Sequence, residues 1–202
     1  MQMWKFLFVA VLLHSGVVMA IEEPKFKVIS QVDEIEIRQY EPMLVAETLV
    51  NSDFEKSGSQ AFRILADYIF GNNQSQTKIS MTAPVTQSSS EKIEMTAPVG
   101  MSKKGEGYLI QFTMPQKYTL ATIPKPNDPR VQLKEIPARK IAVFGYSGSW
   151  SEERYQEKLS HFKGLLQKNK LKSVGEPVFA RFNSPFMIWF LRRNEIWIQL
   201  TD

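Results

Sequence analysis

KISMTAPV at residues 78–85 and KIEMTAPV at residues 92–99 are nearly the same octapeptide, and the polar connector TQSSSE separates them. Pro84 and Pro98 cannot donate a hydrogen bond to a sheet, so they belong at strand ends or on an edge. Each copy alternates apolar and polar residues, which is typical of a half-buried strand. The two copies are therefore expected to pair as a hairpin, with the serine-rich connector at the surface. Its apolar face would carry Ile79, Met81, Ala83 and Val85 from the first copy and Ile93, Met95, Ala97 and Val99 from the second.

The other elements fall in the same order on either side of a proline-rich connector at residues 115–130. Two helices are indicated by apolar residues at helical spacing, each after a Ser-x-x-Glu capping box, at Ser52 with Glu55 and at Ser149 with Glu152. Alternating apolar residues predict the strands. The expected order is strands 34–38 and 43–50, a helix near 53–70, the repeat and strand 108–114; then strands 131–136 and 140–146, a helix near 150–168, and strands 178–182 and 195–200.

This order predicts an α+β fold made of two similar ββαββ halves, residues 31–114 and 131–200. Such a pattern favours a mostly antiparallel sheet with both helices packed on one face. We expect the two halves to superimpose.

The N-terminus has the features of a secretory signal peptide. Lys5 precedes an apolar run, and Val18-Met19-Ala20 provides a cleavage site. A retained membrane anchor is the alternative, but the uncharged run is short for a full span. We expect cleavage after Ala20, leaving residues 21–202 as one exported domain, periplasmic or secreted, with no membrane span.

Composition excludes several functional classes. The formal net charge is +4, or +3 without Lys5, and no concentrated basic stripe indicates nucleic-acid binding. The chain has no cysteine, which excludes disulfides, thiolate metal ligands and the covalent haem motif C-x-x-C-H. Neither a clustered His or Cys metal motif nor a Gly-rich phosphate loop is present.

Four stretches together resemble the SOUL haem-binding protein family: the KIxMTAPV repeats, EIEIRQY at 34–40, PKPNDPRV at 124–131 and RRNEIW at 192–197. The resemblance covers about residues 26–200. It implies two pseudo-symmetric halves that form a twisted, barrel-like sheet with two helices. It also implies non-covalent binding of haem or another tetrapyrrole. Because the fold is shared with effector-binding domains, a different small hydrophobic ligand is the alternative.

Two apolar surfaces exceed what a core requires. The apolar arc of the first helix is wider than a core-facing stripe, and residues 186–191, FMIWFL, form an apolar run between Pro185 and Arg192. This run either covers the end of the core or lines a ligand pocket. The resemblance places the haem cleft between these two surfaces. It points to a site formed by Phe62, Arg63, Ala66, Phe186, Met187 and Ile188, with Arg63 in place of the basic residues that meet the propionates in some members.

No iron ligand is indicated. Some family members carry a histidine where this chain has Gln39. His161 lies about 120° from the apolar stripe of the second helix, so it is expected to face solvent. Arg192 and Arg193 are expected either to be solvated or to pair with a carboxylate. Haem would then be held mainly by burial of its faces.

An enzymatic function has little support. Residues 145–148, GYSG, do not match the nucleophile motif G-x-S-x-G, and no histidine lies nearby to act as a base. We therefore assign no catalytic residue. The one alternative is a hydrolase that uses Glu195, because a buried glutamate in a cleft can activate water. The common outcome for such a residue is pairing with Arg192 or Arg193.

Overall fold

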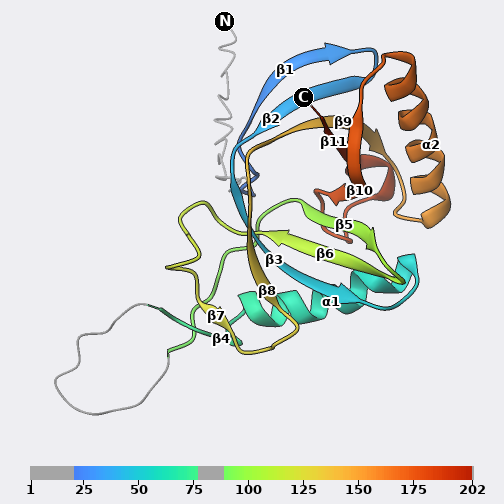
Figure 1. The fold of residues 1–202 in the computed structure, drawn as a ribbon. Helices are drawn as coiled ribbons and strands as arrows, with labels where there is room; N and C mark the ends of the chain where they lie inside the picture. Colours follow the sequence, from blue (N-terminus) through green and yellow to red (C-terminus); the bar gives the residue numbers. More distant parts are fainter. Residues whose placement is uncertain (1–20, 77–88, 202) are drawn as a thin grey trace, which may run out of the picture.

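The computed structural model describes residues 21–76 and 89–201 (Figure 1). The signal-peptide prediction for residues 1–20 and the first octapeptide, at 78–85, lie outside the described residues. Within the described part, no helix is long and apolar enough to span a membrane.

Nine strands form one antiparallel sheet in the order β1-β2-β9-β11-β10-β5-β6-β3-β8. The sheet is twisted (Figure 1) and open, with β1 and β8 at its edges, so the α+β prediction is confirmed but the barrel-like shape is not closed. The strands are β1 Phe26–Val32, β2 Ile35–Tyr40, β3 Met43–Val50, β5 Val99–Lys104, β6 Gly107–Thr113, β8 Gln132–Ile136, β9 Arg139–Ser147, β10 Ser173–Arg181 and β11 Arg193–Leu200. The remaining elements are α1 Phe54–Ile69, α2 Glu152–Lys168, the 3-10 turn η1 Trp189–Leu191, and the short ladder of β4 Asn73–Gln74 with β7 Lys125–Pro126.

The strand order itself shows the duplication. The first half contributes β2, β3, β5 and β6 around α1, and the second contributes β8, β9, β10 and β11 around α2. If each strand is exchanged for its counterpart, the order from β2 to β8 reads the same from the opposite end. The first strand of each half pairs with a strand of the other half: β2 pairs with β9, and β8 pairs with β3. Superposition of residues 31–114 on 131–200, and the extent of a single domain over 21–202, stay predictions.

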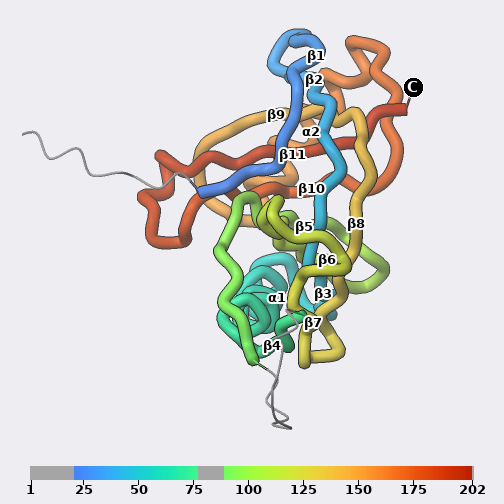
Figure 2. The backbone as a smooth tube through the Cα atoms, turned by 90° about the vertical axis from the view of Figure 1, so that its left-hand side faces the viewer, coloured from blue at the N-terminus to red at the C-terminus, as the bar shows by residue number. Residues whose placement is uncertain are grey.

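Both helices cover the same face of the sheet, as predicted. Most of their buried residues belong to one apolar cluster with side chains of both halves of the sheet. At its centre the ring of Phe54 (α1) stacks on Tyr155 (α2), with centroids 5.3 Å apart, and both rings stack on Phe179 of β10. Figure 2 shows α1 among β3 and β6 at one end of the protein, while α2 lies towards the end that holds β9 and β11. Aromatic stacking therefore joins the two halves.

The opposite face of the sheet is also buried. Tyr40 and Trp197 share a second apolar cluster with Met43 and Ile136, which come from the other end of the sheet. The twist therefore folds the sheet over its own second face, and this interior is filled by side chains.

The helix caps lie two residues or less from their predicted positions, but the capping boxes are wrong. The N-cap of α1 is Asp53, whose carboxylate accepts a hydrogen bond from the Lys56 amide at 2.7 Å. The N-cap of α2 is Ser151, which accepts from the Arg154 amide. Both predicted caps, Ser52 and Ser149, lie upstream of the observed ones. Aspartate and serine are equally good caps, so spacing alone did not decide between neighbours.

The second octapeptide is not a strand before Val99, which corrects the hairpin prediction. Its polar atoms bond to three separate segments: the Ile93 amide to Ile69, the Thr96 hydroxyl to Thr113, and the Ala97 amide to Glu22. Ile93 and Ala97 are buried as expected, but Met95 is exposed and Thr96 is buried. The segment therefore connects several elements without being a strand before Val99. Only some of its alternating apolar residues are buried.

Candidate functional site

A cavity of about 420 Å³ lies between α1 and the helix-covered face of the sheet at β5 and β6. Phe62, from α1, forms part of its wall and contacts Phe112 with ring centroids 5.6 Å apart. The turn before α2 adds Trp150, and the end of β10 adds Arg181. The walls are mostly apolar, which suits a hydrophobic ligand. The lining residues from the sheet are Val99, Met101 and Ile110.

The structure brings together only some of the expected site residues. Phe62 and Arg63 line the cavity, and Pro185 reaches it from the segment between β10 and β11. Ala66 is buried and is not among the lining residues. Phe186, Met187 and Ile188 do not line it either. The binding role of all six residues stays a prediction.

The apolar run at residues 186–191 is exposed throughout, from 40% at Met187 to 95% at Phe186. It therefore does not cover the end of the core, which was one of the two expectations. Arg192 fixes the base of this segment, because its guanidinium donates to the carbonyls of Pro185 (2.8 Å) and Met187 (3.0 Å). The same guanidinium lies 4.4 Å from the centre of the Trp150 ring. The run stands beside the cavity, attached to its wall, as a contiguous apolar surface of the kind that marks binding sites.

Arg181 lines the cavity although the sequence did not indicate this position, as is also true of Trp150 and the residues from β5 and β6. Its guanidinium packs over Phe179 at 4.7 Å and over Trp150 at 5.1 Å. A single arginine near the end of a predicted strand carries no signal of this position, since a strand-end arginine is usually solvated. The partner aromatic Trp150 lies in a different turn.

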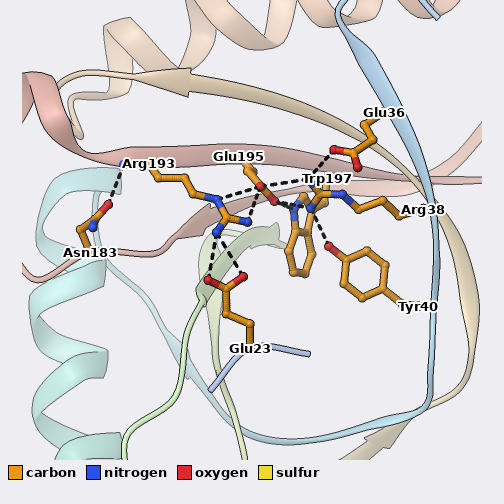
Figure 3. A network of polar contacts seen from close by, with 8 residues as sticks. All are labelled: Glu23, Glu36, Arg38, Tyr40, Asn183, Arg193, Glu195 and Trp197. Atoms are coloured by element: carbon orange, nitrogen blue, oxygen red, sulfur yellow. Dashed lines mark hydrogen bonds and ion pairs between the residues drawn. The ribbon is translucent and has the colours of Figure 1, made fainter. Parts of the chain in front are cut away.

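Glu195 is buried in a polar network on the opposite face of the sheet (Figure 3). Its carboxylate accepts hydrogen bonds from Arg38 at 3.0 Å, from Arg193 at 2.8 Å and from the Trp197 indole at 2.6 Å. Arg193 also pairs with Glu23. Every donor around the carboxylate is directed at it, so its oxygens are occupied by structural partners. This arrangement disfavours Glu195 as a base that activates water, and it confirms the expected pairing with Arg193.

Burial and neighbouring charges fix the protonation of two groups in this network. Burial lowers the pKa of Arg38. The hydrogen bond to Glu36 and the charge of Glu195 outweigh this effect, so the pKa of Arg38 lies above its ordinary value. Burial raises the pKa of Tyr40, which accepts a hydrogen bond from Arg38, to about 12. These groups therefore keep one charge state across the physiological range, which suits a structural role.

The other ligand candidates lie away from the cavity. His161 is exposed on α2 and its ring contacts Glu34 at 2.9 Å, as its position on the helix predicted. Gln39 donates to the Tyr40 carbonyl. In the described ranges, no group of three or more His, Cys, Asp and Glu residues is placed to hold a metal ion. The cavity therefore offers apolar walls and cationic groups rather than imidazole.

Comparison with known proteins agrees with the fold and the motifs. Heme-binding protein 2 from Mus musculus and Heme-binding protein 2 from Homo sapiens are each 29% identical to this chain over 187 residues, or 89% of this chain and 86% of the relative. The crystal structure of the EcmrR C-terminal domain matches 83% of this chain and 97% of its own with a TM-score of 0.60, at 9% identity, which shows a common fold alone. A family model described as SOUL heme-binding protein matches residues 21–199. The chain therefore belongs to the SOUL heme-binding protein family.

Proposed function

We propose that this chain is an exported protein that binds haem or a related tetrapyrrole non-covalently in the cavity beside α1. Family membership supports tetrapyrrole binding. The proposed location of the binding site rests on the apolar cavity of about 420 Å³, whose volume lies within the usual range for ligand sites. Export rests on the N-terminal sequence.

The residues of the cavity suit a tetrapyrrole. Phe62, Met101 and Ile110 offer apolar contact to a flat ring system, and two arginines are available for carboxylates. Haem would supply this large aromatic surface together with its iron and two propionates. Among the described residues no histidine lines the cavity, so burial of apolar area, worth about 25 cal/mol per Å², is the main source of affinity. Metal-free porphyrins should therefore bind as well.

Titration of the purified mature chain tests the proposal. Haem binding is followed by absorbance and protoporphyrin IX binding by fluorescence, both at micromolar concentrations. Phe62→Glu places a charge in the cavity wall and removes an aromatic contact, so affinity should fall about 10- to 100-fold. Phe62 is 40% exposed, so the fold should tolerate this change.

Two control variants set the interpretation. Leu120→Glu changes a residue of similar exposure, 44%, that does not line the cavity, and it should leave affinity unchanged. His161→Ala should leave the spectrum of bound haem unchanged. Failure of the wild-type chain to bind either tetrapyrrole would refute the proposed function. Equal losses in Phe62→Glu and Leu120→Glu would refute its location.

The alternative in which Glu195 hydrolyses a substrate receives no support from the geometry, because its carboxylate is occupied by Arg38, Arg193 and Trp197. Binding of another small hydrophobic ligand by the same cavity is the second candidate. The apolar lining favours it as strongly as it favours haem, and a competition titration against bound porphyrin distinguishes the two.

A further inference from the structure

Arg181 is a partly buried cation that packs against aromatic rings. It ends β10, and its guanidinium lies over the rings of Phe179 and Trp150 in the wall of the cavity. Cation–π contacts of this kind offset part of the cost of removing an arginine from water. They provide no acceptor for its five N–H groups.

No anionic partner accompanies this charge. Among residues 21–76 and 89–201, the structure gives the Arg181 guanidinium no hydrogen bond and no ion pair, and its Nε is buried without an acceptor. The ionisable groups that act on it are the Tyr146 phenol and then Arg192, which is also a cation. Burial lowers the pKa of Arg181 to about 10. By contrast, the buried Arg38 pairs with two carboxylates. A cation withdrawn from water is normally paired, and among the described residues the fold supplies no such pair for Arg181.

Helix α1 leaves room for this unpaired group. Gly58 faces the guanidinium, and a Cβ atom at this position would lie 2.9 Å from the Arg181 Nη1. Glycine inside a helix costs about 0.5–1 kcal/mol relative to alanine. Here its absent side chain lets the guanidinium reach the helix at the edge of the cavity.

We propose that Arg181 binds the carboxylate of an amphipathic ligand whose apolar body fills the cavity. The ligand class is therefore an apolar acid, and for a tetrapyrrole the acid is a propionate. This inference deepens the proposed function and rests on the same cavity. The planar guanidinium can hold a carboxylate through two parallel hydrogen bonds, and the apolar surroundings strengthen them.

Matched acid and ester ligands test the proposal. Protoporphyrin IX and its dimethyl ester share one ring system, and the ester has no carboxylate. The wild-type chain should bind the acid about 10- to 100-fold more tightly, because a charge-assisted pair is lost in the ester. Arg181→Met keeps the length and apolar character of the side chain, so it should weaken acid binding and leave ester binding unchanged. The acid-to-ester ratio of this variant should approach one.

Arg139→Met is the matched control. Arg139 is also partly buried with an Nε that lacks an acceptor, but it borders a pocket of only about 20 Å³ on the other face of the sheet. That space holds about one water molecule. Arg139→Met should therefore retain the wild-type preference for the acid. An equal loss of preference in both variants would contradict the assignment to Arg181.

The remaining outcomes separate the inference from the proposed function. If the wild-type chain binds acid and ester equally, or if Arg181→Met keeps the preference, the role of Arg181 is refuted while tetrapyrrole binding stands. If neither tetrapyrrole binds, the proposed function fails, and the same comparison is made with pyrenebutyric acid and its methyl ester by fluorescence. A preference for that acid which depends on Arg181 supports the inference alone. Absence of binding or of preference there overturns it.

Discussion

Replacing Glu195 by glutamine should destabilise the protein strongly, because the carboxylate is the common acceptor of a buried network. Glu195 is 3% exposed, and both of its oxygens are surrounded by donors. An amide has the same shape but turns one oxygen into an NH₂ group. That NH₂ would face either Arg193 or the Trp197 indole, donor against donor, while the negative charge that balances the arginines is lost.

The structure sets the size of the effect. Removing one partner of a buried ion pair costs about 3–5 kcal/mol. Arg38 keeps Glu36 at 2.7 Å and Arg193 keeps Glu23 at 2.9 Å, so we expect the lower end, about 3 kcal/mol. For a chain of this size, about 3 kcal/mol corresponds to a fall in Tm of about 6–12 °C.

Thermal and urea unfolding of the mature chain measure this change. Glu94→Gln is the control, since Glu94 forms an exposed pair with Lys117 that contributes little. A Glu195→Gln variant as stable as the wild-type chain would refute the argument that this network is structural. If that variant were stable and had also lost a hydrolytic activity of the wild-type chain, Glu195 would be a catalytic residue.

Four further predictions follow from single features. Phe54→Ala removes the ring that joins α1 to Tyr155 and should cost about 3–5 kcal/mol in urea unfolding. Asp53→Ala should destabilise the fold at neutral pH, whereas Ser52→Ala should not. Hydrogen bonds from Lys56 lower the pKa of Asp53, so the stability that its carboxylate contributes is lost as pH falls below about 3.8. A pH series of unfolding curves measures this loss. Arg181→Met should raise the Tm of the ligand-free chain, because it removes a partly buried cation that has no ion pair among the described residues. Intact mass of the exported protein should correspond to a chain that begins near residue 21, and a retained Met1 would contradict the signal peptide.

The fold was predictable because its signals are local and repeated. Strand β3 has the predicted bounds, Met43–Val50, since its apolar residues leave one interpretation. The pairing of β2 with β9 was not predictable, because exchange of first strands between the halves leaves no mark in a single sequence. The second octapeptide shows the limit of periodicity. Its alternation predicts a strand, but the backbone of Ile93 and Ala97 finds partners in separate segments, which only tertiary structure decides.

The site was only partly predictable, for a different physical reason. Phe62 and Arg63 could be placed because the family resemblance indicated a cleft beside the first helix, and both residues line the cavity there. The run at 186–191 has little regular structure, so its composition indicated an apolar surface but not which way its side chains face. Arg181 could not be found, since its lack of a partner depends on every neighbour that the fold brings near it.

The two helices show how a duplicated fold can hold one cavity of this kind beside α1. When the helices are aligned by their N-caps, Asp53 and Ser151, the buried Tyr155 and Leu159 of α2 correspond to Ser57 and Ala61 of α1. At these two positions α2 buries large side chains and α1 buries small ones, and Gly58, next to Ser57, lines the cavity. Phe54 anchors the first turn of α1 by stacking on Phe179. The cavity, and the approach of Arg181 to Gly58, therefore arise where the repeat departs from its own symmetry.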